Sequence, residues 1–355
     1  MEKNVVTASS ELLAKQRKKA LIFIISMLVG VLLLFFISFL VGTRYYGFAE
    51  TYQALFGFGD SVVVRVVNRV RLPRAIAAVV VGAGLAISGL IMQTCLKNPM
   101  ASPSTMGVSN AATLGANLAI LFLTGSTTSS FTAVSASPYA ISAFALLFAL
   151  ICTSVVLALS SLRRFSPTTV VLVGVAMGSL FQALVTLLQY FADDVQLSTI
   201  VSWTFGDLER MSMGENGILG VIVLAAFILF FLLSYRYNAL SGGENFARSL
   251  GVRTSTLRFV GLFVASLITA VAVSFVGIIG FVGIIAPHIC KRIVGSDHRF
   301  LLPASALCGS FLLLFCDIAT RLIGQGIALP VGAITAIIGA PFFIFIVFSR
   351  KEVKQ

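Results

Sequence analysis

Long apolar segments recur along the chain and alternate with short segments that carry most of the charged residues. The first two uncharged runs extend from Ala20 to Gly42 and from Ala75 to Leu96. Each run can cross about 30 Å of hydrocarbon as a helix, because a helix rises about 1.5 Å per residue. The first run is longer than the apolar region of about 7–15 residues in a cleavable signal peptide, so we expect a retained span.

The middle of the chain predicts four more spans. The uncharged window from Asn98 to Leu162 is too long for one helix, and the polar stretch from Thr124 to Pro138 divides it into a third and a fourth span. The fifth runs from Pro167 to Ala192 and the sixth from about Asn216 to Tyr235. The charged segment between them, DDVQLSTIVSWTFGDLERMSMGE, must lie outside the hydrocarbon, and we expect its amphipathic centre to rest at the membrane interface.

The stretch from Phe259 to Cys290 is uncharged, is longer than one helix needs, and has basic residues at both ends. Because basic residues favour the cytoplasmic side of a membrane, the chain must cross the bilayer and return. Three glycines, Gly277, Gly280 and Gly283, allow close helix approach and a turn near Val276. The pattern therefore predicts a seventh span and a short eighth span.

The predicted fold class is an all-α, polytopic membrane protein with ten transmembrane helices and both termini in the cytoplasm. The ninth span runs from Leu301 to about Leu322, and the tenth from Leu329 to Phe348. We expect a cytoplasmic N-terminal segment over residues 1–19, a single ten-helix domain over residues 20–349, and a cytoplasmic tail over residues 350–355.

Composition and charge agree with this interpretation. Of 355 residues, 58% are hydrophobic and 11% are charged, and the mean hydropathy is +1.02, whereas soluble domains average about 25% charged residues. Most of the 25 Lys and Arg residues lie in segments predicted to be cytoplasmic. The exceptions are Arg44, Arg65, Arg69, Arg71, Arg74, Arg210 and Arg321. Four of these cations lie in one short outer loop and need a partner, while the basic residues as a whole form no stripe that would predict nucleic-acid binding.

Candidate chemistry within the spans is sparse. The sequence lacks the G-x-x-x-x-G-K-[ST] motif, so we expect a partner protein to supply any ATP-derived energy. Asp317 is the one acidic residue within a predicted span, and an ion-coupled carrier would use such a group. Arg321 follows four residues later on the same helix face, which favours a structural ion pair over a proton relay. We predict no metal site, because His288 and His298 have no third ligand nearby beyond Asp297.

The loop between the sixth and seventh spans, over about residues 238–257, contains a short helical pattern. It runs from Glu244 to Leu250 and is followed by Gly251, a candidate for the C-terminal cap. The pattern has one apolar face, which contains Phe246, Ala247 and Leu250. Such a helix either caps the bundle or docks into a groove on a soluble partner.

Four long segments resemble the FecCD-type permeases of iron-siderophore and cobalamin ABC importers. These segments are Val70 to Ala116, Gly242 to Val252, Gly280 to Leu307 and Leu329 to Ile346. The resemblance covers nearly the whole chain after the first span. It implies a bacterial inner-membrane permease that pairs with a second permease, identical or paralogous, and works with two ATP-binding subunits and an extracytoplasmic binding protein. It also implies that this chain binds no cofactor, and that ATP and Mg are handled by the partner ATPase.

The resemblance implies roles for individual residues. Arg71 and Arg74 of the VRLPR motif, together with Arg321, would receive glutamates of the binding protein, whereas Arg65 and Arg69 lie outside that core motif. The segment that engages the ATPase would contain Gly243, Glu244, Ala247, Arg248, Ser249, Leu250 and Gly251. Pro167 and Thr168 would lie at a cytoplasmic gate.

The predicted function is import of a ferric siderophore by alternating access. Small residues are frequent in the spans, as in GAGLAISGL and GVAMGSL, and they suit both close packing and a smooth pore without strong ligands for a bare ion. Haem or cobalamin are the alternative solutes within the family. A proton-coupled secondary carrier that uses Asp317 is the alternative from another class, and a receptor-like membrane protein without transport is a third.

Overall fold

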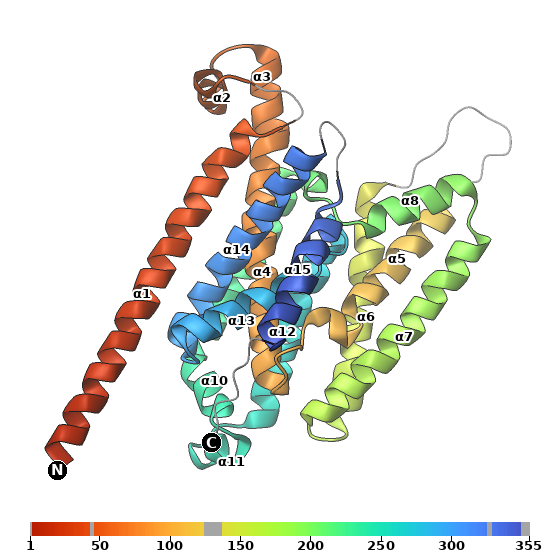
Figure 1. Cartoon of the computed structure of the whole chain (residues 1–355). Coiled ribbons are helices and arrows are strands. Elements are labelled where there is room, and N and C mark those ends of the chain that lie inside the picture. Colours follow the sequence, from red (N-terminus) through yellow and green to blue (C-terminus); the bar gives the residue numbers. More distant parts are fainter. Residues whose placement is uncertain (1, 43–45, 124–136, 325–328, 349–355) are drawn as a thin grey trace.

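The computed structural model describes residues 2–42, 46–123, 137–324 and 329–348. Within these ranges the chain is helical and contains no strand, which confirms the all-α class (Figure 1). Arg44 and the expected tail over residues 350–355 lie outside the described residues.

Each span predicted from the hydropathy pattern coincides with a helix. These helices are α1 (Glu2–Leu40), α4 (Leu72–Leu96), α5 (Val108–Leu123), α6 (Pro138–Ser161), α7 (Pro167–Phe191), α9 (Met213–Leu232), α12 (Thr254–Val276), α13 (Val282–Val294), α14 (His298–Ile323) and α15 (Val331–Phe348). Seven helical segments of the described chain are long and apolar enough to cross a membrane, with α3 and α4 forming one of them. The predicted total of ten spans therefore depends on the shorter helices α5, α13 and α15, and it stays a prediction.

The break between α12 and α13 occurs where the glycine pattern predicts it. Helix α12 ends at Val276, and Gly277 adopts a φ of +77°, which favours glycine. A Cβ atom on Gly277 would also lie 2.5 Å from the carbonyl oxygen of Trp203. Both the backbone conformation and the close approach therefore require glycine at this turn.

Helix α4 lies at the centre of the bundle and packs against α12, α13 and α14 (Figure 1). The backbones approach so closely that a Cβ atom on Gly89 would lie 1.7 Å from the carbonyl oxygen of Gly283 in α13. Gly82 faces Gly309 of α14 in the same way, at 2.5 Å. The small residues of α4 thus allow dense packing where apolar burial adds little driving force in lipid.

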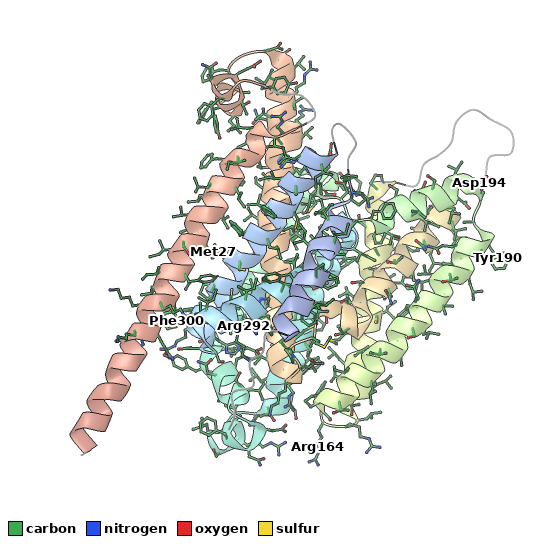
Figure 2. The ribbon with its side chains drawn as sticks, in the orientation of Figure 1. Met27, Arg164, Tyr190, Asp194, Arg292 and Phe300 are labelled. Carbon is green, nitrogen blue, oxygen red and sulfur yellow. The ribbon has the colours of Figure 1, made fainter. Side chains whose placement is uncertain are left out.

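Helix α1 runs along the side of the bundle against α14 and exposes many large apolar side chains (Figure 2). These include Leu21, Ile22, Ile25, Leu32, Leu33 and Phe36. Apolar side chains that face away from the protein suit contact with lipid.

Short helices lie at the two ends of the bundle (Figure 1). At one end are α2 (Phe48–Leu55), α3 (Ser61–Val66), the π-helical turn η1 (Val67–Arg71), α8 (Asp194–Thr204) and the 3₁₀ turn η3 (Leu208–Arg210). At the other, predicted to be cytoplasmic, are α10 (Ser234–Ser241) and α11 (Glu244–Ser249). A further 3₁₀ turn, η2 (Pro103–Met106), lies against α7.

Candidate functional site

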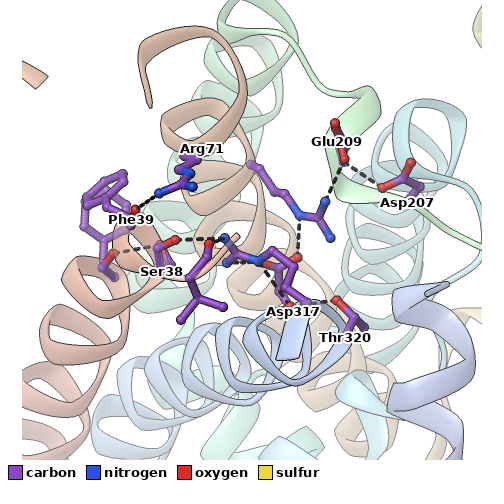
Figure 3. A network of polar contacts seen from close by, with 11 residues as sticks. Ser38, Phe39, Arg71, Asp207, Glu209, Asp317 and Thr320 are labelled. Carbon is purple, nitrogen blue, oxygen red and sulfur yellow. Dashed lines mark hydrogen bonds and ion pairs between the residues drawn. The ribbon is translucent and has the colours of Figure 1, made fainter. Parts of the chain in front are cut away.

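Asp317 of α14 is fully buried at the predicted outer end of the bundle and binds two arginines (Figure 3). Arg74 donates its Nε–H to Asp317 Oδ1 at 2.7 Å, and Arg321 donates from Nη2 to Oδ2 at 2.5 Å. Arg74 also donates from Nη1 to Glu209 of η3 at 2.7 Å. Arg74 and Arg321 are thus paired directly with the two carboxylates, which buried charges require.

The arginines of this cluster also bind the carbonyl oxygens at the end of α1. Arg321 Nη1 donates to the carbonyl oxygens of Ser38 and Val41, at 2.8 Å each, and Arg71 donates to that of Phe39. The last carbonyl groups of a helix have no partner within the helix, and positive charge there is favourable. The outer cluster therefore joins α1, α4, η3 and α14.

All three arginines predicted to dock the binding protein lie in this cluster. All three already bind groups of this chain, and Arg71 and Arg74 are only 5% and 6% exposed. Glu209, by contrast, is 46% exposed and lies in a short turn. An acidic partner would therefore reach Arg74 by replacing Glu209, and the docking role stays a prediction.

Two expectations about this region have different outcomes. The ion pair between Asp317 and Arg321, four residues apart, is confirmed. The contacts of Arg74 with Glu209 and Asp317 were missed, although the excess of outer cations indicated that a partner was needed. Arg65 and Arg69 are exposed and lie outside the cluster.

The predicted short helix is confirmed as α11, which ends at Ser249, one residue before the predicted end. Its cytoplasmic location stays a prediction. Gly243 precedes it with a φ of +128°, and Gly251 follows with a φ of +76°. The Val252 N–H returns to the carbonyl oxygen of Ala247 at 3.0 Å, and the Gly251 N–H to that of Arg248 at 2.9 Å. These bonds close the helix end around a left-handed glycine.

The apolar face of α11 is divided between the bundle and the outside. Ala247 is fully buried, whereas Phe246 and Leu250 are 53% and 60% exposed. Exposed large apolar side chains on a short surface helix suit a groove on a partner. Ser249 also lies on this helix, with its hydroxyl bonded to the carbonyl oxygen of Phe246 at 2.8 Å.

Glu244 ties α11 to the core through Arg258 of α12. Its carboxylate accepts from Arg258 Nη2 at 3.0 Å and from Arg248 Nη2 at 2.6 Å. Arg258 is 1% exposed and donates its Nε–H to the carbonyl oxygen of Cys95, in the last turn of α4, at 3.1 Å. Partial burial favours the neutral carboxyl, but the hydrogen bond and charge of Arg258, followed by the charges of Arg248 and Lys97, lower the pKa of Glu244 below its ordinary value.

The role of Arg258 is not visible in the sequence, where it looks like one more basic residue beside a span. Its burial and its two partners make it a link between α11 and α4. One signal was available, because Arg258 lies one helical turn after the first residue of α12 and directly before the apolar part of that helix.

The predicted gate residues lie at the start of α7. Pro167 occupies the first helical position, where its missing N–H costs no hydrogen bond, and Thr168 is exposed. Further along α7, a cavity of about 530 Å³ lies beside η2. Its lining includes the small or polar residues Ser104, Thr105, Asn110, Gly174, Gly178 and Gln182. Thr168 is not part of that lining.

Comparison with known proteins identifies the chain. The model of the FecCD transport family matches residues 28–349. The chain belongs to the FecCD transport family. FecCD members are permease subunits of ABC importers that work with ATPase and binding-protein partners, so this chain is a multi-pass protein of the inner membrane.

Individual relatives extend over nearly the whole of this FecCD chain. A protein of Methanocaldococcus jannaschii, named as an ABC transporter permease, is 45% identical over 94% of this chain and 96% of its own length. The iron(3+)-hydroxamate import permease of Bacillus subtilis is 33% identical over 99% of this chain and 88% of its own length. Other FecCD-like relatives are named for import of vitamin B12 in Vibrio cholerae and of molybdate in Haemophilus influenzae.

A solved structure supports the fold of this FecCD permease. It is described as an inward-facing conformation of a metal-chelate type ABC transporter. The two chains have a TM-score of 0.80 and 31% sequence identity, over 92% of this chain and 98% of the other. Shared fold and sequence over this length make the chain an ABC importer permease.

Proposed function

We propose that this permease passes a ferric siderophore from an extracytoplasmic binding protein into the cytoplasm, by alternating access driven by a partner ATPase. The observation that carries the proposal is that α4 contacts a charged cluster at each end. Arg74 connects its outer end to Glu209 and Asp317, and Arg258 connects its inner end to Glu244. A single central helix thus contacts both surfaces that an importer must coordinate.

At the outer end, a glutamate of the binding protein would replace Glu209 on Arg74. The exchange substitutes one carboxylate for another, so the buried charge of Arg74 stays compensated throughout. Glu209 belongs to the short turn η3, and Asp207 at the start of this turn donates its backbone N–H to the carbonyl oxygen of Val276 at 2.7 Å. Displacing Glu209 would therefore pull on the break between α12 and α13.

At the inner end, Phe246 and Leu250 would insert into a groove on the ATPase. Two ATP-binding subunits would bind ATP and Mg, and a second permease, identical or paralogous, would complete the pore. Movement of α11 on nucleotide binding would reach α4 through Glu244 and Arg258. Rocking of packed helices around a fixed passage is the motion that alternating access requires.

The passage itself would use the small and polar face of α7. The cavity beside η2 has a volume of about 530 Å³ and exposes hydroxyl and amide groups without any charged side chain in its lining. Such a surface offers no strong ligands to a bare ion and suits a large chelate. Pro167 and Thr168 would close this passage from the cytoplasmic side.

The choice of a ferric siderophore draws on the relatives named for iron-hydroxamate import and for metal chelates. Haem or cobalamin are the alternatives within the family, and a relative is named for vitamin B12. The proton-coupled carrier loses its support, because Asp317 is fully buried and bound to both Arg74 and Arg321.

Stimulated ATP hydrolysis tests the proposed solute. The complete complex is reconstituted in vesicles, and ATPase rates are measured with its binding protein loaded with a ferric siderophore, haem or cobalamin. We expect the siderophore-loaded protein to stimulate hydrolysis most. Stimulation by the haem- or cobalamin-loaded protein alone would overturn the choice of solute.

A further inference from the structure

A second cavity lies at the cytoplasmic end of the bundle, between α10, α11 and the start of α12. It has a volume of about 680 Å³. Its lining includes Leu233, Tyr235, Arg236, Arg253, Leu257 and Val260. Leu250 and Gly251 of the segment proposed to engage the ATPase also line it. The proposed function uses only these two lining residues and gives the rest of the cavity no role.

The cavity carries two positive charges and no negative one. Arg236 and Arg253 are its only charged lining residues, and both are exposed. Within the part of the chain that the structure describes, neither guanidinium forms an ion pair or a side-chain hydrogen bond. The neighbouring Arg258, by contrast, is bound to Glu244. The two unpaired guanidinium groups therefore favour a negatively charged ligand.

Apart from Tyr235 and Thr256, the remaining lining carries no polar side chain, and it continues toward the membrane-spanning segments. Leu233, Leu257 and Val260 line the cavity, at the ends of α9 and α12 that meet the predicted cytoplasmic surface. On the same two helices, Leu232 and Phe259 are 73% and 42% exposed. A ligand that fits this site combines an anionic group with long apolar chains.

Tyr235 is held in place on one side of the cavity. Arg299 donates to its hydroxyl at 3.1 Å, and the guanidinium lies 5.0 Å from the centre of its ring. Arg299 is bound in turn to Asp297 at 2.7 Å. Burial of Asp297 favours its neutral form, but hydrogen bonds from Arg299 and Asn238 outweigh it and lower the pKa of Asp297 to about 2. Tyrosines are enriched at the membrane interface, where their rings lie at the level of the headgroups.

We propose that this cavity binds the phosphodiester headgroup of an anionic phospholipid of the inner leaflet. Arg236 and Arg253 bind the phosphate oxygens, and the acyl chains follow the apolar surface beside Leu232 and Phe259. Basic pockets between helices at the cytoplasmic surface bind such headgroups, and guanidinium forks match phosphate geometry. Since Leu250 and Gly251 share the cavity, the lipid also supports the segment proposed to contact the ATPase.

Lipid retention by the whole complex tests the proposal. The permease is purified with its ATPase, equilibrated with cardiolipin, phosphatidylglycerol or phosphatidylcholine, and bound lipids are counted by native mass spectrometry. The test variant is R236Q/R253Q. The matched control is R163Q/R164Q, which removes the same charge from the turn after α6, where both arginines are exposed and outside the cavity lining.

We expect the wild type and the control to retain the anionic lipids in preference to phosphatidylcholine. Each cavity arginine should contribute about fivefold to retention, equivalent to about 1 kcal/mol per basic residue near the surface. Equal retention by the test variant and the control would overturn the proposal, and so would equal retention of phosphatidylcholine by the wild type. If the test variant retained lipid as the control does, but lost the bound ATPase in lipid-free detergent, the proposal would be overturned and the cavity would belong to the ATPase contact. None of these outcomes depends on which solute is transported.

Discussion

Arg74 and Asp317 are separated by 243 positions in the sequence and meet at 2.7 Å inside the bundle. The contact joins the start of α4 to the end of α14, and Arg321 binds the other oxygen of the same carboxylate. Because all three side chains are nearly or fully buried, none can lose its partner without leaving a charge uncompensated. The outer arginines therefore hold the bundle together as well as forming a candidate docking surface.

Replacing Asp317 by Asn should strongly destabilise the permease. It leaves Arg74 and Arg321 without their shared counter-charge, and breaking a buried ion pair costs about 3–5 kcal/mol. The half-exposed Glu209 gives the matched comparison, because E209Q should cost about 1 kcal/mol or less. Thermal unfolding of the purified variants measures the difference, and equal midpoints for D317N and E209Q would contradict this account of the cluster.

The same Glu209 variant should strengthen docking of the binding protein. E209Q removes the carboxylate that competes for Arg74 while preserving side-chain size, so we expect affinity to increase about fivefold, or about 1 kcal/mol. The gain should shrink as salt concentration rises. The control D194N removes an exposed acid from α8 at the same end of the molecule (Figure 2). If E209Q bound the binding protein with unchanged or weaker affinity, Glu209 would not compete for Arg74, and the proposed docking of the binding protein at Arg74 would be wrong.

Arg258 should govern how well ATP hydrolysis is coupled to transport. R258Q breaks the link from Glu244 to α4, and coupling energies of about 0.5–2 kcal/mol predict a two- to thirtyfold loss in solute moved per ATP hydrolysed. R258K should be intermediate, since it keeps the charge and loses the fork. R248Q is the control, because Arg248 binds the same carboxylate from the exposed side. If R258Q kept the ATPase bound and moved as much solute per ATP as the wild type, Arg258 would not transmit movement from α11 to α4.

The local sequence predicts much of the fold because hydropathy, glycine turns and neighbouring charges act over short distances. The turn after Val276 and the pair between Asp317 and Arg321 are of this kind. The contacts of Arg74 and Arg258 arise only when distant helices pack, with partners 243 and 163 positions away. The sequence shows Arg258 as one more basic residue beside a span, and it indicates that Arg74 needs a partner without identifying Glu209 and Asp317.

The contribution of Asp297 to stability should follow pH in a defined way. Its folded-state pKa of about 2 lies below the unfolded value of about 3.9, so its stabilising effect is fully present above the unfolded value. The effect is lost as pH falls through the folded value. The difference in melting temperature between the wild type and D297N should therefore be constant from about pH 8 to 5 and should shrink below about pH 4. A difference that changes between pH 8 and 5 would contradict this assignment.

The source of energy for uptake tests the central claim most directly. The complex is reconstituted in vesicles with ATP enclosed on the ATPase side and the loaded binding protein on the other, and accumulation of radiolabelled ferric siderophore is measured. We predict that uptake requires both ATP and the binding protein and continues when an ionophore dissipates the proton gradient. Uptake that collapses with the gradient while ATP remains would contradict the account.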